Sequence, residues 1–248
     1  MRRISSVIIV LLAYLQTVQA QDRTVQNRPY TDLRPFHFGV LVGTHFQDIE
    51  LVNAGPQVIT MDDGSQVHSI VTADQDRWDA GLNVGVLGEF RLSTYFQFRL
   101  APAMYFGTRH ITFHNFTPSE TSPKQIEETQ GMRTAYISTA MDLIFAAPRF
   151  NNYRPYLMAG LNPMINLSGS DNDYLKLNRY DAYLELGVGC DLYLPFFKLR
   201  PELKFMYGLT NALDTNHAND IRDKNMLRFT NSVKEAHTKM IALTFYFE

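Results

Sequence analysis

Residues 180–209 have the sequence YDAYLELGVGCDLYLPFFKLRPELKFMYGL and decide the fold class. Between 181 and 194, every second residue is leucine, valine, alanine or cysteine, and the residues between them are polar, tyrosine or glycine. After a short Pro-Phe-Phe-Lys turn the alternation restarts in 199–210. A period of two with one apolar and one charged face predicts two antiparallel β-strands. Such a hairpin is typical of a transmembrane β-barrel, with a soluble β-sandwich as the alternative.

The N-terminus has the pattern of a secretory signal peptide. Two arginines precede an apolar run over Val7–Leu15, and Val18-Gln19-Ala20 supplies a cleavage sequence. We expect cleavage after Ala20, so that residues 1–20 are the signal peptide and the mature chain is exported. The apolar run is too short for a transmembrane helix, which needs about 20 residues.

Composition excludes several classes of function. Removing residues 1–20 lowers the basic residues from 23 to 21 against 25 acids, which gives a mature net charge of −4. The sequence has no stripe of basic residues, so we expect no nucleic-acid partner. The single Cys190 excludes an intrachain disulfide, and its place on an apolar face predicts a small hydrophobic side chain. We find no metal-ligand spacing and no phosphate-binding glycine motif, so we expect no metal and no cofactor.

Alternation recurs along the chain and predicts eight strands. We expect them over residues 36–47, 78–91, 96–113, 132–145, 155–167, 180–194, 199–210 and 239–247. An even number of strands can close into a barrel without a free edge.

The predicted connections alternate in length. Short turns are expected at 92–95, 147–154 and 195–198, and long polar loops at 48–77, 114–131, 168–180 and 211–235. Outer-membrane barrels have short periplasmic turns and long extracellular loops. A soluble β-sandwich is not expected to sort its connections by length in this way. The sequence therefore predicts an all-β, eight-stranded antiparallel transmembrane β-barrel over residues 36–248, in the outer membrane. Residues 21–35 are polar and form an extended periplasmic lead-in.

Two further features concern the strands. Aromatic residues gather at the short-turn ends, Tyr193 among them, as expected for an interfacial girdle. Pro102 and Pro163 fall within strands and remove ladder donors, so we expect bulges there, or an end of the fifth strand near Pro163.

The predicted inward faces carry many charges. They are Asp79, Glu89, Arg99, Asp142, Glu185, Asp191, Arg200, Glu202 and Lys204. Eight strands leave an interior only wide enough for side chains, and buried charges are stable only when paired. We therefore expect a charge-paired plug in place of a passive pore; a polar conduit or proton relay is the functional alternative.

Some outer-membrane barrels are hydrolases or acyltransferases, so we sought catalytic pairs. Three candidates combine a histidine with a neighbouring acid or histidine: His45 with Asp48, His110 with His114, and His217 with Asp220. None has a spacing that specifies a site. We expect no catalytic residues, no enzymatic activity and no small-molecule substrate.

Three segments resemble the PorT family of Bacteroidota. They are LRPFHFGVLVGTHFQDIEL (33–51), YRPYLMAGLNP (153–163) and RPELKFMYGLTNAL (200–213). The resemblance spans nearly the whole mature chain. It implies an integral outer-membrane component of the type IX (Por) secretion system, needed for export of proteins such as gingipain-type proteases. The implied partners are outer-membrane lipid and other secretion-system proteins. A small surface-binding or adhesin-like barrel is the alternative function.

Overall fold

The computed structural model describes residues 25–60, 64–117, 126–169, 173–219, 221 and 226–248. The predicted signal peptide and its cleavage after Ala20 lie outside these residues. Within the described part, no helix is long and apolar enough to cross a membrane.

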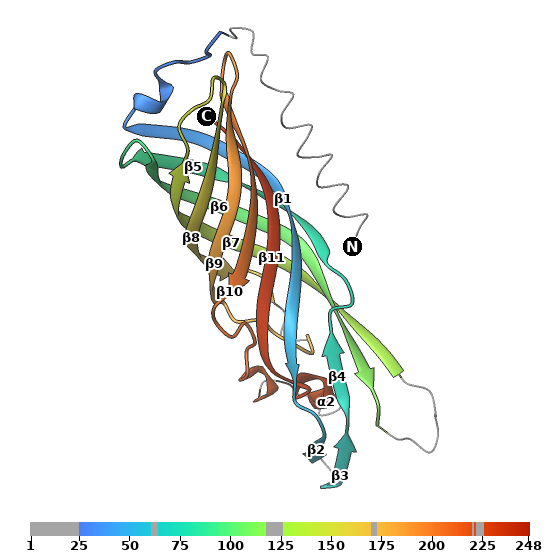
Figure 1. The fold of residues 1–248 in the computed structure, drawn as a ribbon. Coiled ribbons are helices and arrows are strands. Elements are labelled where there is room, and N and C mark those ends of the chain that lie inside the picture. The colour runs from blue at the N-terminus through green and yellow to red at the C-terminus, as the bar shows by residue number, and fades with distance from the viewer. Residues whose placement is uncertain (1–24, 61–63, 118–125, 170–172, 220, 222–225) are drawn as a thin grey trace, which may run out of the picture.

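Eight long antiparallel strands form the wall of a closed barrel (Figure 1). They are β1 (Phe36–Asn53), β5 (Asp79–Arg91), β6 (Phe96–Asn115), β7 (Ile126–Ala146), β8 (Tyr153–Asn166), β9 (Tyr180–Tyr193), β10 (Lys198–Gly208) and β11 (Val233–Phe247). Each strand pairs with the next, and β11 pairs back with β1 from Val40↔Phe247 onward. The predicted all-β, eight-stranded antiparallel barrel is confirmed.

The register is staggered around the barrel. Starting from Phe36, the cross-strand partners are in turn Phe90, Phe98, Leu143, Ala159, Leu186, Phe205, Ile241 and Phe46. The path returns to β1 ten residues beyond its start, at Phe46 instead of Phe36. Such a stagger requires the strands to tilt against the barrel axis. All nine side chains of this ring are apolar, as expected for a surface in contact with lipid.

The strands continue toward the long-loop end beyond the band of outward apolar residues, here called the lipid-facing band. In this continuation apolar side chains face inward and charged ones face outward. On β1, apolar side chains face outward up to Phe46, whereas farther along Ile49 is buried and Glu50 is exposed. On β6, Arg109 is followed by the buried Ile111 and Phe113. The prediction that a loop begins at 48 was therefore wrong, because β1 continues to Asn53. β6 ends at Asn115, close to the predicted 113, but β7 already begins at Ile126 and not at 132. Alternation persists on this part of β1, and the outward residues Asp48 and Glu50 are charged because water replaces lipid outside.

The predicted long loops contain short elements of their own. β2 (Gln57–Thr60) and β3 (Gln66–Ser69) form a hairpin, and β4 (Val71–Asp74) pairs with the end of β6. The last long connection contains η3 (His217–Asn219) and α2 (Leu227–Thr230). These segments bring apolar side chains together over the barrel opening: Ile49, Val71, Ala73, Ile111, Phe113, Met132, Leu175, Leu177, Ala212, Leu213, Phe229, Val233 and Ala236. The long-loop end is thus closed by an apolar cap.

The expected proline bulges are absent from the described strands. Pro102 projects outward, and on its β5 side the pairing pauses after Gly85↔Ala103 and then resumes in the same register. Pro163 interrupts the β7–β8 pairing in the same way, and β8 continues to Asn166. Each ring occupies the lipid-facing side and removes one donor from the ladder, so the strand needs no extra residue.

Candidate functional site

A buried ion pair bridges the barrel interior in its short-turn half. Arg99 Nη1 of β6 donates to both carboxylate oxygens of Glu202 of β10, at 3.1 and 2.8 Å. Strands β7, β8 and β9 separate β6 from β10 on one side, and β5, β1 and β11 on the other. The pair therefore joins opposite walls. The hydroxyls of Tyr156 and Tyr246 donate to the same carboxylate at 2.7 and 2.9 Å, so the buried charge is well solvated by protein.

A second arginine extends this network toward the short-turn mouth. Arg200 Nε lies 2.5 Å from Asp191 Oδ1, and its Nη1 lies 2.7 Å from Glu248 Oε1. The same Nη1 contacts Glu89, whose carboxylate is also 3.6 Å from Arg99 Nε. Glu89 thus links the two arginines. The side chains of this set are all buried, and buried charges are stable only when they are paired.

A third group lies on the other side of Arg99. Lys204 Nζ is 3.3 Å from Glu185 Oε2, and the Asn162 amide donates to Glu185 Oε1 at 2.6 Å. Asp142 lies 3.8 Å from Arg99 Nη1 and shares a row of cross-strand positions with Gly160 and Glu185, so it lies between this group and the first.

Eight of the nine charges expected inside the barrel belong to this network. The exception is Asp79, which sits at the start of β5, where its carboxylate accepts from the His110 backbone N–H at 2.9 Å. Sequence reasoning missed Lys198 and Glu248, which pair at 2.5 Å. Both lie just beyond the predicted strand ends. Continuing the alternation by one residue would have found them.

Glycines make room for the large inward side chains. Tyr156 pairs across strands with Gly189, Asp142 with Gly160, and His45 with Gly81. A β-carbon on Gly189 would lie 2.3 Å from Tyr156 Cζ, which is far inside contact distance. The polar plug therefore depends on a glycine directly opposite each of these three bulky residues.

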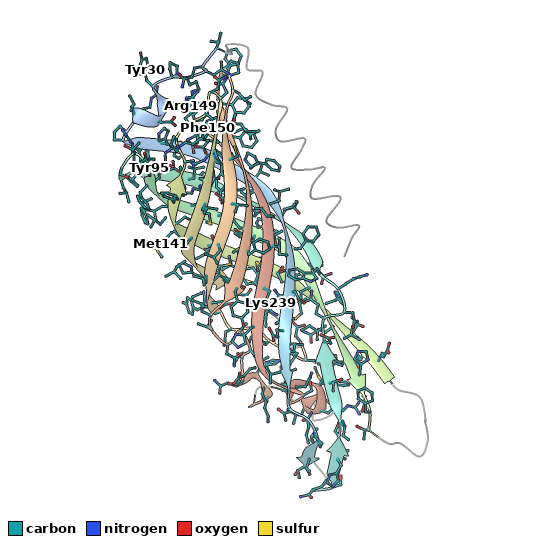
Figure 2. All side chains as sticks on the ribbon, in the orientation of Figure 1. Tyr30, Tyr95, Met141, Arg149, Phe150 and Lys239 are labelled. Atoms are coloured by element: carbon teal, nitrogen blue, oxygen red, sulfur yellow. The ribbon has the colours of Figure 1, made fainter. Side chains whose placement is uncertain are left out.

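The lead-in closes the short-turn mouth, and the expectation that it is extended was wrong. It contains η2 (Thr31–Leu33) and docks on the β7–β8 turn, where the Asn27 backbone N–H donates to Asn152 Oδ1 at 2.9 Å. The Arg149 guanidinium, labelled in Figure 2, stacks over the Tyr193 ring at 3.6 Å from its centroid. It also donates to the backbone carbonyls of Asn27 and Arg28. Tyr193 donates to Asp32 at 2.6 Å.

This docking also corrects the predicted girdle. Tyr193 points inward and is buried, so it is not an interfacial residue. Exposed aromatic pairs do occupy the short-turn end, for example Phe36 with Phe90 and Phe96 with Phe145, at centroid distances of 5.0 and 5.3 Å. Tyr193 differs from them because alternation places it on the polar face of β9.

The candidate catalytic pairs are not brought together by the fold. His45 is buried in the interior, whereas Asp48 lies on the opposite face of β1, across from Lys239. His110 contacts Asp79 at 2.6 Å, and His114 lies 3.5 Å from Glu127.

The third candidate, His217, has its Nε2 2.7 Å from the backbone oxygen of Asp173, and Asp220 lies outside the described residues. Among the residues with described positions, no three His, Cys, Asp or Glu side chains group as a metal site would require. What the geometry does support is a plug: charged side chains span the interior from wall to wall and are closed in at both ends.

Comparison with known proteins agrees with this architecture. A family model described as "Outer membrane protein beta-barrel domain" matches residues 19–214. Among curated proteins, no sequence matches this chain.

Three solved structures are similar in shape. OprG of Pseudomonas aeruginosa has 11% identity and a TM-score of 0.45, with 85% of this chain and 95% of that chain covered. Ail of Yersinia pestis, solved with the heparin analogue sucrose octasulfate, has 12% identity and a TM-score of 0.38, with 86% and 99% covered. The outer membrane protease OmpT of Escherichia coli has 12% identity and a TM-score of 0.39, with 91% and 99% covered. At these scores none of the three carries an argument about activity.

Proposed function

This chain belongs to the outer membrane β-barrel domain family, and from that premise we propose that it is a non-enzymatic component of the type IX protein secretion system. In this role it is needed for the export and maturation of secreted proteins such as gingipain-type proteases. The three segments that resemble the PorT family support the assignment to this system. The observation that carries the non-channel role is the Arg99–Glu202 bridge, which crosses the interior.

A plugged barrel acts through its partners. Eight strands enclose too little space for a folded protein, and here that space is filled by paired charges. The channel for secreted proteins is then a separate, larger protein, and this barrel contacts the apparatus through its surfaces.

The short-turn end offers the most exposed aromatic side chains for such contacts. Phe196, at the tip of the β9–β10 turn, is 93% exposed, and Tyr30 of the lead-in is 76% exposed. Figure 2 shows Tyr30 and Phe150 at this end of the barrel. The contacts of Arg149 hold the lead-in against the barrel, so the position of the exposed Tyr30 is fixed relative to the barrel.

The test is deletion of the gene followed by complementation. We expect precursors of secreted proteins to accumulate in the periplasm of the deletion strain, and the wild-type gene to restore secretion. Normal amounts of mature protein at the cell surface after deletion would refute the proposal.

Partner capture gives an independent readout. A C-terminal tag is unsuitable because Glu248 is buried against Lys198 and Arg200. An affinity tag beside Gly64, where no described atom lies within 4 Å of an added β-carbon, leaves the barrel wall untouched. Recovery of other secretion components from detergent-solubilised outer membranes is expected; recovery of the barrel alone would argue against a role in the apparatus.

A second candidate function is surface binding, favoured by the β2–β3 hairpin at the long-loop end. Val58 and Val67 on this hairpin are 53% and 37% exposed. Replacing residues 55–69 by a short Gly-Ser linker should abolish binding to cells or matrix while secretion continues. If the same replacement instead stops secretion, the hairpin serves the apparatus.

A further inference from the structure

A hollow opens in the lipid-facing wall between β6 and β10. It is a cavity of about 470 Å³, and its lining is almost entirely apolar. The side chains that shape it are Phe96, Phe145, Leu157, Ala159, Leu186 and Phe205. All six lie on the outward face of their strands, so the hollow opens toward the membrane and not toward the plugged interior.

The hollow exists because of Ala159. In the outward ring that follows the strand register, Ala159 lies between Leu143 and Leu186, and every other position carries a leucine, isoleucine or phenylalanine. Behind it, Met158 and Gly187 form a cross-strand pair, and Gly187 adds no side chain. The wall is therefore thin at this point, and the large neighbours form a rim around a small residue.

We propose that this hollow binds one acyl chain of a phospholipid. The lining offers no charged or amide side chain, so its occupant is hydrocarbon. An unfilled hollow would leave its lining atoms without dispersion contacts on one side, which costs packing energy. A chain seated in it touches the wall on several sides, whereas a chain on the convex remainder of the band touches it on one.

The position of the hollow indicates which lipid supplies the chain. Phe96 and Phe145 are the first paired residues at the short-turn end of β6 and β7. Short turns face the periplasm in outer-membrane barrels, so the hollow starts in the periplasmic leaflet, which is made of phospholipid. An apolar segment of a partner protein is the competing occupant, but helix contacts in membranes also use polar side chains, and none lines the hollow.

The experiment counts lipids that stay bound to the whole protein. The barrel is reconstituted in nanodiscs of palmitoyl-oleoyl phosphatidylethanolamine and phosphatidylglycerol, then transferred to mild detergent for native mass spectrometry. We expect wild type to retain one phospholipid and Ala159→Phe, which fills the hollow, to retain none. Ala80→Phe is the matched control, because it adds the same bulk on the exposed outward face of β5, away from the hollow. Heat-modifiable migration on gels verifies that each variant is folded.

Several outcomes would overturn the inference. Equal retention by Ala159→Phe and Ala80→Phe, or no retained lipid on wild type, excludes a specific chain site. A photo-crosslinker at Leu157 gives a second readout in cells: lipid adducts support the inference, and a protein adduct assigns the hollow to a partner. The inference requires only an outer-membrane barrel, so its failure leaves the proposed secretion role intact.

Discussion

Arg99 on β6 and Glu202 on β10 join opposite walls of the barrel at 2.8 Å, although 103 positions separate them in the chain. The pair is fully buried and is hydrogen-bonded by Tyr156 and Tyr246. A cross-wall pair of this kind fills the interior and fixes the relative position of strands that do not touch each other.

Removing one partner of this pair should be strongly destabilising. Glu202→Gln leaves the Arg99 charge buried without its main counter-charge, and such losses cost about 3–5 kcal/mol. Equilibrium urea unfolding in lipid vesicles measures the change. Glu50→Gln is the control: Glu50 pairs with Lys239 at 2.5 Å on the outer surface, where solvent screens the pair and its loss should change the stability little. Equal effects of the two substitutions would contradict the plug.

Replacing both members of the bridge should cost less than replacing one. Arg99→Met with Glu202→Met removes both charges and leaves apolar side chains of comparable length, which can be close to neutral in stability. The double variant should still lose some stability, because Glu89 and Asp142 also lie within 4 Å of the Arg99 guanidinium and would lose that contact. A double variant as unstable as the sum of the single variants would show that the two residues do not interact.

Gly189→Val should displace the Tyr156 ring. A β-carbon at Gly189 would overlap that ring, and overpacking of this kind costs about 1–3 kcal/mol. The displaced ring also loses its hydrogen bond to Glu202. Gly131→Val is the matched control on β7, where no atom of the described residues lies within 4 Å of an added β-carbon. Similar unfolding midpoints for the two variants would show that the glycine is not needed for the fit.

Leu186→Arg tests the inside–outside assignment. Leu186 lies in the outward ring at the middle of β9, where an arginine facing lipid costs about 2–4 kcal/mol. Val52→Arg places the same charge outward beyond the lipid-facing band, where little effect is expected. The fraction of folded barrel recovered from outer membranes is the measurement. Full recovery of Leu186→Arg would mean that this face does not contact lipid.

Arg149→Ala should release the lead-in. The substitution removes the stacking on Tyr193 and the hydrogen bonds to Asn27 and Arg28, which together predict about tenfold faster tryptic cleavage after Arg28 or Arg34. Arg77→Ala, an exposed arginine at the other end of the barrel, controls for the loss of charge. Unchanged cleavage rates in Arg149→Ala would show that other contacts hold the segment.

The sequence by itself determined the barrel wall. Period-two alternation placed Leu186 outward and Glu185 inward, because a strand between lipid and a polar interior must separate its side chains in this way. The same alternation identified nearly all the charges of the plug. The prediction failed where lipid ends: beyond Phe46 the outward positions carry Asp48 and Glu50 while Ile49 is buried, and a strand with charged outward residues resembles a polar loop in sequence.

Only the tertiary structure decided which charges meet. Alternation states that Arg99 and Glu202 face inward, but the choice of partner depends on closure and stagger of the strands, which bring β6 opposite β10. The docking of the lead-in on Arg149 and the hollow at Ala159 likewise depend on the tertiary structure. Each arises where side chains from separate strands converge, and local sequence patterns contain no information on that convergence.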